Sequence, residues 1–207
     1  MDLQERFSRN CIQISENIKL INDLWLEIEK KYSEKGRHYH NFEHLQNMFI
    51  ELSQVTPTIT DLTAITFSVF YHDVIYNVSS KTNEEKSAEF ARKHLRKLCT
   101  DTDLAEKVSQ QIIATKLHIS EDSDTNYLLD ADLSVLGQKS EKYIEYTQKI
   151  RKEYSIYPDL LYKPGRKKVL HHFLESESIF KTNYFREKYE DQARKNIQSE
   201  IESLNFG

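Results

Sequence analysis

Histidine and aspartate residues that can bind a metal recur at three separate places in this sequence. His44 lies near the start of one predicted helix, the pair His72-Asp73 ends the next, and Asp132 lies within a later helix. Neutral imidazole and carboxylate are the ligands that divalent metals take where no thiolate is offered. Two His and two Asp from three facing helices could hold one metal and leave coordination positions for water and substrate.

Both aspartates are surrounded in the sequence by apolar residues. Burying a carboxylate costs several kcal/mol unless it is paired or bound to a metal. A buried His–Asp hydrogen bond without a metal would meet the same requirement, so the spacing alone leaves both interpretations open. The apolar neighbours are Phe70, Tyr71, Val74 and Ile75 around Asp73, and Leu128, Leu129, Leu133 and Leu136 around Asp132.

The rest of the pattern predicts a helical protein that positions these residues. Apolar residues from Phe7 to Ile28 recur at alternating spacings of four and three, which predicts one amphipathic helix of about six turns that packs on the core. Asn41 is a predicted N-cap, Thr60 or Asp61 opens the next helix, and Thr82 with Glu85 forms a capping box. Further helices are predicted near residues 103–115, 128–137, 142–154, 166–173 and 184–204, with Pro164 and Gly165 in a break. We therefore expect a single all-α domain over residues 1–207, with eight or nine helices and a core near 37–137.

Composition excludes several classes of protein. The 207 residues contain only 4 Gly and 3 Pro, which argues against a turn-rich all-β fold. The net charge of −4 disfavours binding to a nucleic-acid polymer or a membrane surface. No apolar run is long enough to span a bilayer, and the N-terminus lacks a hydrophobic signal region. Cys11 and Cys99 fall on predicted buried faces, so we expect no disulfide and a reducing, cytoplasmic location.

Three other histidines need no metal to explain them. His171 and His172 lie beside Lys167 and Lys168, and His94 lies between basic residues. A solvated basic helix face is the interpretation that we favour for all three.

The order and context of these motifs resemble the HD superfamily of metal-dependent phosphohydrolases, and most closely a compact bacterial branch of predicted HD-superfamily hydrolases. The resemblance covers about residues 5–205. It implies an all-α HD-type bundle, one bound divalent metal (Mn, Fe, Co, Ni, Zn or Mg), and His44, His72, Asp73 and Asp132 as the ligands. Its motifs are RHYHNFEH (37–44), YHDVIYN (71–77), NEEKSA (83–88), ATKLH (114–118), LLDADLSVLG (128–137), IRKEY (150–154), GRKKVL (165–170) and ARKNI (193–197).

The resemblance also implies roles for residues near the ligands. Glu84 would orient or deprotonate the attacking water, although it could instead complement the helix dipole. Arg37 is the first choice for the phosphate, because a guanidinium offers a bidentate fork. His40 would face the mouth of the pocket or stay at the surface, and His118 would contact phosphate or move a proton. For Arg151 and Arg194, structural salt bridges with Glu153 or Asp191 are at least as good an explanation.

The expected activity is hydrolysis of a phosphate ester by metal-activated water, with Asp73 and Glu84 in catalysis. The expected substrate is a nucleotide or another small phosphorylated metabolite, acted on by a monomer or homodimer. Two alternatives stay open: an iron-dependent oxygenase, which would need a second metal and an extra ligand such as His118, and a nucleotide-sensing module without catalysis.

Overall fold

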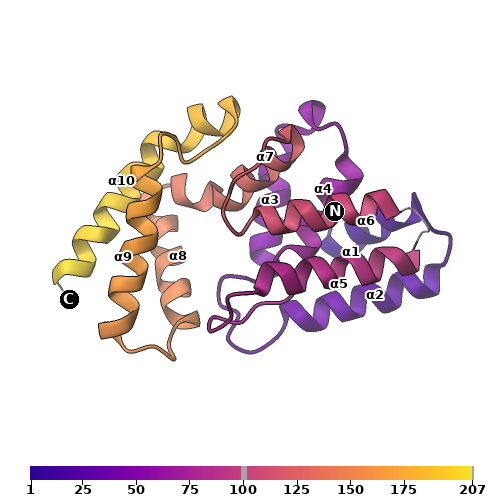
Figure 1. Ribbon diagram of the computed structural model, residues 1–207, viewed down its shortest axis with the longest axis horizontal. Coiled ribbons are helices and arrows are strands. Elements are labelled where there is room, and N and C mark those ends of the chain that lie inside the picture. The colour runs from indigo at the N-terminus through magenta and orange to yellow at the C-terminus, as the bar shows by residue number, and fades with distance from the viewer. Residues whose placement is uncertain (99–101, 207) are drawn as a thin grey trace. The chain divides into compact units, whose positions relative to one another are not determined.

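The computed structural model describes residues 1–98 and 102–206, and every regular element among them is a helix. Ten α-helices and two short 3-10 helices are present there, without a strand, which confirms the all-α prediction (Figure 1). Contacts divide the chain into two compact units, Met1–Leu128 (unit 1) and Leu129–Gly207 (unit 2). The expectation of one domain over 1–207 stays a prediction.

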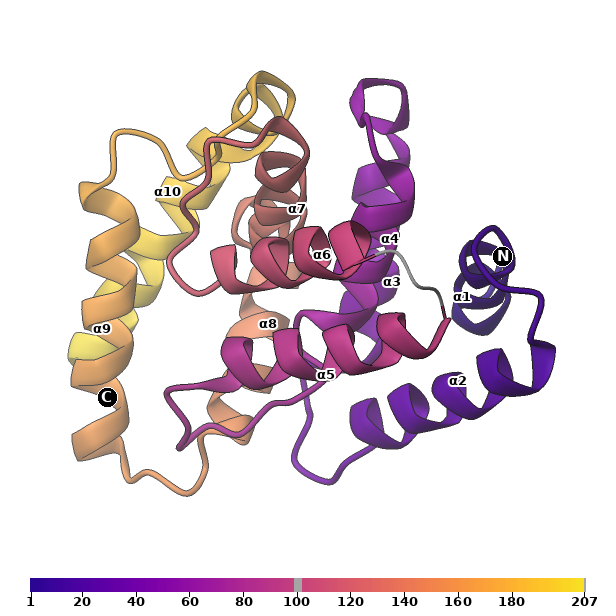
Figure 2. The ribbon, with the colours of Figure 1, turned by 45° about the vertical axis from the view of Figure 1, so that its right-hand side comes forward.

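Unit 1 is built around one almost completely buried helix. Every residue from Ala64 to Tyr71 in α4 is buried, and α4 contacts α1, α3, α5 and α6. α5 and α6 lie side by side (Figure 2). The helices of this unit are α1 (Leu3–Ile12), α2 (Ile18–Tyr32), α3 (Phe42–Ser53), η1 (Thr56–Thr58), α4 (Leu62–Tyr71), α5 (Asn83–Leu98), α6 (Thr102–Ala114) and the start of α7 (Ser123–Leu133).

The predicted caps of α3 and α4 are confirmed. The Asn41 side chain accepts a hydrogen bond from the backbone N–H of Glu43, and Asp61 accepts one from Ala64. Each cap satisfies one of the amide groups that a helix N-terminus leaves without a partner. The two caps therefore fix where the helices that carry His44 and His72 begin.

The prediction of one long helix from Phe7 to Ile28 is wrong, because the chain breaks between α1 and α2. Asn17 caps a new helix by accepting the N–H of Leu20 at 3.0 Å, and the Ser15 hydroxyl accepts the N–H of Asn17. Ile18 continues the apolar spacing but is 53% exposed, so the stripe does not follow one buried face. Two short helices that pack on each other replace the long one.

Unit 2 holds the end of α7 and the helices that follow it. These are η2 (Ser134–Gly137), α8 (Ser140–Glu153), α9 (Asp159–Glu175) and α10 (Asn183–Phe206). η2 packs closely on α10, where a Cβ atom added to Gly137 would lie only 2.4 Å from Cβ of Tyr189. The α10 helix therefore needs a residue without a side chain at position 137.

The predicted break at Pro164 and Gly165 is wrong, since both residues lie inside α9. The helix begins instead after Pro158. An internal proline removes the bond to the carbonyl four residues earlier, here that of Leu160. Leu160 is 84% exposed, so water can satisfy that carbonyl and the helix continues.

His94 is buried, which corrects the expectation of a solvated basic face. Only 2% of it is exposed, and its ring nitrogens lie 3.1 Å from the Tyr71 hydroxyl and 3.2 Å from a Glu27 carboxylate oxygen. Burial lowers the pKa of His94, and Glu27 opposes that shift. His171 and His172 are exposed, as expected.

The two cysteines and the apolar helices bear on the expected absence of a disulfide and of a membrane span. Cys11 is fully buried as a free thiol, and burial raises its pKa to about 12. Cys99 lies outside the described residues. Within residues 1–98 and 102–206, no helix combines the length and the apolar character that crossing a bilayer requires.

Candidate metal centre

His44 enters the site from the first turn of α3. It lies three residues after the Asn41 cap, and only 3% of it is exposed. Its neighbours Leu45 and Met48 are fully buried and hold this face of α3 against the core. The His44 imidazole is therefore held in a buried position by the same packing that fixes the helix.

His72 and Asp73 lie where α4 ends. The backbone N–H of His72 still bonds to the carbonyl of Ser68, and the Tyr32 hydroxyl donates to the Phe70 carbonyl at 3.1 Å. His72 is 1% exposed, whereas the Asp73 side chain keeps 19% of its surface accessible. His72, a candidate ligand, is thus buried, and the neighbouring carboxylate is accessible to solvent.

A backbone hydrogen bond orients the His72 ring. Nδ1 of His72 lies 3.0 Å from the carbonyl oxygen of Val69, so Nδ1 carries the proton and donates. In the neutral ring this leaves Nε2 with its lone pair, which is the form that binds a metal. Such a second partner is the usual companion of a metal-binding histidine. The sequence analysis missed it, because no side-chain pattern marks a backbone acceptor.

Three candidate ligand atoms converge at the end of α4. Nε2 of His72 lies 3.2 Å from Nε2 of His44 and 3.1 Å from Oδ2 of Asp73, and the His44 and Asp73 atoms are 3.9 Å apart. Ligands about 2.1 Å from one metal lie about 3.0 Å apart at a right angle and about 3.4 Å apart at the tetrahedral angle. The observed spacings fit a shared divalent cation. The donor set of imidazole and carboxylate fits Mn, Fe, Co, Ni or Zn.

Asp132, the fourth predicted ligand, lies on α7. This helix continues without interruption through Leu128 and Leu129, and it carries Asp132 on its last turn. One donor atom each of His44, His72 and Asp132 lies within 4.8 Å of the other two, and these residues form a cluster that could hold a metal ion.

Asp130, two residues earlier, has a different function. It is fully buried, and its carboxylate accepts hydrogen bonds from the N–H of Lys181 and from both the N–H and the hydroxyl of Thr182, each at 2.7 Å. Burial raises the pKa of Asp130, while these bonds oppose the shift. Asp130 therefore holds the turn that leads into α10.

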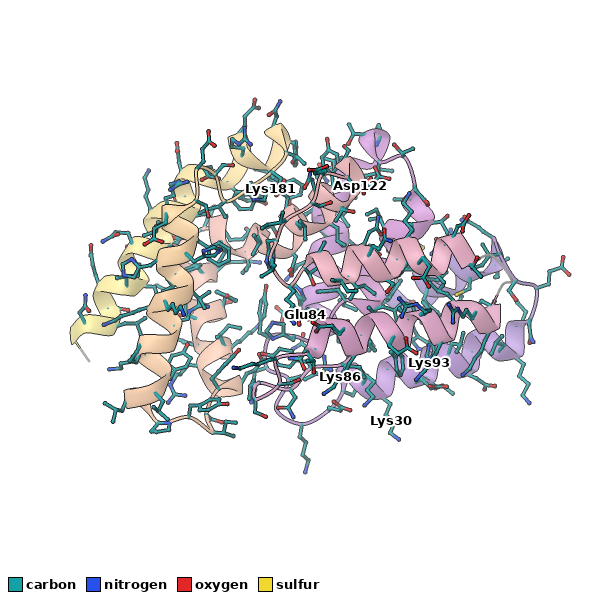
Figure 3. The ribbon with its side chains drawn as sticks, viewed as in Figure 1. Lys30, Glu84, Lys86, Lys93, Asp122 and Lys181 are labelled. Atoms are coloured by element: carbon teal, nitrogen blue, oxygen red, sulfur yellow. The ribbon has the colours of Figure 1, made fainter. Side chains whose placement is uncertain are left out.

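Glu84 and Glu85 share the first turn of α5 but differ in their contacts. Glu85 forms an ion pair with Lys116, which lowers the pKa of the Glu85 carboxyl. Glu84, labelled in Figure 3, is half-buried. In the described part of the chain, its carboxylate forms no hydrogen bond or ion pair. Its expected role at the attacking water stays a prediction.

Arg37 lies beside this group, but its donors point into the protein. Its two terminal nitrogens bond to the carbonyl oxygens of His40, Asp73 and Val74 at 3.1, 2.7 and 2.9 Å. Only 3% of the side chain is exposed. These contacts direct the terminal nitrogens of Arg37 to backbone carbonyls next to the candidate ligands.

Aromatic rings lie beside His40 and His44. The His40 ring stacks on Tyr76 with 4.1 Å between centroids, and Tyr39 lies 4.9 Å from the His44 ring. His40 is half-buried, and its expected place at the mouth of a pocket stays a prediction. Tyr71, by contrast, is fully buried in the core of unit 1.

His118 lies just beyond α6, in an unusual backbone conformation. Its φ angle is +53°, the left-handed region, and its N–H bonds to the Ala114 carbonyl at 2.9 Å. This is the geometry of a helix C-terminus closed by one left-handed residue, a position that usually holds glycine. The expected contact of His118 with phosphate stays a prediction.

Three further arginines, in unit 2, have structural partners there. Arg166 forms a bidentate pair with Glu200, in which both side chains are at most 10% exposed. Arg151 pairs with Asp159. Arg194 pairs with Glu190 and donates to the carbonyls of Leu174, Ser176 and Glu177. Salt bridges were expected for Arg151 and Arg194, but with different partners.

Comparisons with known proteins give no family for this chain. No family model matches it, and neither the curated proteins nor the solved structures that were searched contain a match.

Proposed function

We propose that this chain is a divalent-metal-dependent hydrolase of phosphate esters, of the HD type. The convergence of His44, His72 and Asp73 at spacings of 3.1 to 3.9 Å carries the proposal. The Val69 carbonyl, which orients His72 for coordination, supports it further. Asp132 is the fourth proposed ligand.

The chemistry that we propose suits this donor set. A bound divalent metal lowers the pKa of a coordinated water and polarises a phosphoryl oxygen. The Asp73 side chain is 19% exposed, so it has access to the attacking water as well as to the metal. Glu84 is the proposed base, because its carboxylate is not engaged by any other described group. The proposed substrate is a nucleotide or another small phosphorylated metabolite.

The test is a phosphate-release screen on nucleotides and sugar phosphates, with Mn²⁺, Co²⁺, Ni²⁺, Mg²⁺ and Zn²⁺ supplied in turn. We expect metal-dependent release by the wild-type protein and none by Asp73→Ala, with helicity retained. Release that is equal in the two proteins would refute the proposed site. No release with any metal from folded protein would refute the proposed activity, and about two irons per chain after purification would point to oxygen chemistry.

Adjacent glutamates provide a matched control for the proposed base. Glu84→Gln should lower kcat by roughly 10²- to 10⁴-fold, which is the usual contribution of a positioned general base. Glu85→Gln, one residue further along the same turn, removes the ion pair with Lys116 and should leave kcat within about twofold. Equal effects of the two substitutions would assign Glu84 a role in the helix only.

A further inference from the structure

We infer that Arg37 is a positioning residue of the metal centre, which sets metal affinity by holding together the two backbone segments that carry the ligands. This inference rests on the proposed metal-dependent function. It replaces the expectation that Arg37 binds the phosphate of the substrate.

The guanidinium connects the segment before α3 to the segment after α4. One terminal nitrogen, Nη1, donates both to the carbonyl of Asp73 and to the carbonyl of His40, four residues before His44. The other, Nη2, donates to the carbonyl of Val74. The peptide of a ligand residue is thus tied directly to the loop that leads into the helix of another ligand.

These carbonyls need a partner at this place. The last carbonyl groups of a helix have no backbone N–H donor within the helix. An arginine side chain is one of the groups that can donate to them. The chain turns after α4, so the carbonyls of Asp73 and Val74 lie beyond the helical hydrogen bonds. Without Arg37 both would have to find water in a region where Val74 is fully buried.

Aromatic rings fix the direction of the side chain. The Arg37 guanidinium carbon lies 5.0 Å from the centre of the Tyr32 ring and 5.6 Å from that of Tyr76. Tyr32 is itself anchored by its hydroxyl to the Phe70 carbonyl in α4. Gly36, with φ of +95°, makes the turn that brings the chain to this point. The position is therefore held from both sides, and the guanidinium has little freedom to swing toward a ligand.

A lysine cannot take over this function. Its single ammonium group lacks the planar fork that reaches three carbonyls from one position. Arg37→Lys keeps the charge and removes the fork, so Asp73 and the His40–His44 segment should lose their common anchor. Loss of a group that orients metal ligands lowers metal affinity by roughly 10- to 100-fold.

The experiment is calorimetric titration of metal-free protein with Mn²⁺. We compare wild type, Arg37→Lys, Arg37→Ala and the control Arg92→Lys. Arg92 also holds a fork of hydrogen bonds in unit 1, to Glu89, Glu106 and Ser109, but none to the segments that carry the ligands. Unfolding in urea measures the stability of each variant.

We expect both Arg37 variants to bind Mn²⁺ roughly 10- to 100-fold more weakly, and Arg92→Lys to bind it as wild type does after a similar loss of stability. Methylguanidinium added to Arg37→Ala should restore part of the affinity, because it fits between Tyr32 and Tyr76. It should have no effect on Arg92→Lys.

Three results would overturn the inference in distinguishable ways. Wild-type affinity for Mn²⁺ in both Arg37 variants would exclude the positioning role and leave the metal centre intact. Unchanged Mn²⁺ affinity together with weaker binding of inorganic phosphate to the metal-loaded protein would return Arg37 to the substrate. Failure of the wild-type protein to bind any metal would refute the proposed function and this inference together.

Discussion

Two aspartates in the segment Leu128–Leu133 should respond in opposite ways to the same substitution. Residues two positions apart on an α-helix point about 200° from each other, so Asp130 and Asp132 face different surroundings. Asp130 accepts three hydrogen bonds from Lys181 and Thr182, whereas Asp132 belongs to the candidate ligand cluster. We expect Asp130→Ala to cost stability and Asp132→Ala to cost metal binding.

The magnitude for Asp130 follows from its contacts. Hydrogen bonds to a charged group contribute about 1.5–3 kcal/mol each, which gives an upper limit of about 4.5–9 kcal/mol for three. The burial that raises the pKa of Asp130 opposes this gain, and the released N–H groups are only partly buried, so water can reach them. We expect a net loss of about 3 kcal/mol, which corresponds to a fall in Tm of about 6–12 °C for a chain of this length.

Urea and thermal unfolding followed by far-UV circular dichroism measure this loss, and calorimetric titration with Mn²⁺ measures metal binding. Both are done on metal-free protein. Asp130→Ala should unfold at lower temperature and still bind one metal, whereas Asp132→Ala should keep its stability within about 1 kcal/mol and lose at least tenfold in affinity. Equal stability of the two variants, or loss of metal from Asp130→Ala alone, would refute this division of roles.

Two further predictions concern the packing of each unit. Burial lowers the pKa of His94, so the unfolded chain takes up a proton there before the folded one does, and stability should fall as the pH drops below about 6.5. Urea unfolding at pH 7.5 and 5.5 should show a larger loss for wild type than for His94→Gln, and parallel losses would contradict the burial argument. Gly137→Ala places a methyl group 2.4 Å from Cβ of Tyr189 and should cost about 1–3 kcal/mol in thermal unfolding, whereas an unchanged Tm would mean that η2 and α10 can separate without cost.

Local signals were sufficient to predict the helices that carry the candidate ligands. The caps at Asn41 and Asp61 depend on side chains that bond to amides two or three residues away, so their chemistry is contained in a short window. The hydrophobic run of α4 likewise predicts a buried helix. The break at Asn17 was missed because the apolar spacing continues across it. Asn17 is nevertheless a residue type that favours the N-cap position of a helix.

Contacts between distant residues could not be predicted in the same way. His94 lies among basic neighbours in the sequence, yet it is buried in the fold and contacts Glu27, which is 67 residues away. The targets of Arg37 are backbone carbonyls, which every residue has, so the sequence contains nothing that distinguishes them. Spacing also left a metal site and a His–Asp pair open, and the distances of 3.1–3.9 Å between the side-chain atoms are compatible with both.

The backbone conformation of His118 has a consequence for the stability of this chain. A residue with a side chain pays roughly 1–2 kcal/mol to adopt the left-handed conformation at φ +53°, whereas glycine adopts it freely. The greater flexibility of glycine in the unfolded chain cancels only about 0.5–1 kcal/mol of that advantage. Selection for stability alone would therefore favour glycine or asparagine here. The His118 side chain therefore occupies a backbone conformation that glycine would adopt at a lower cost in free energy.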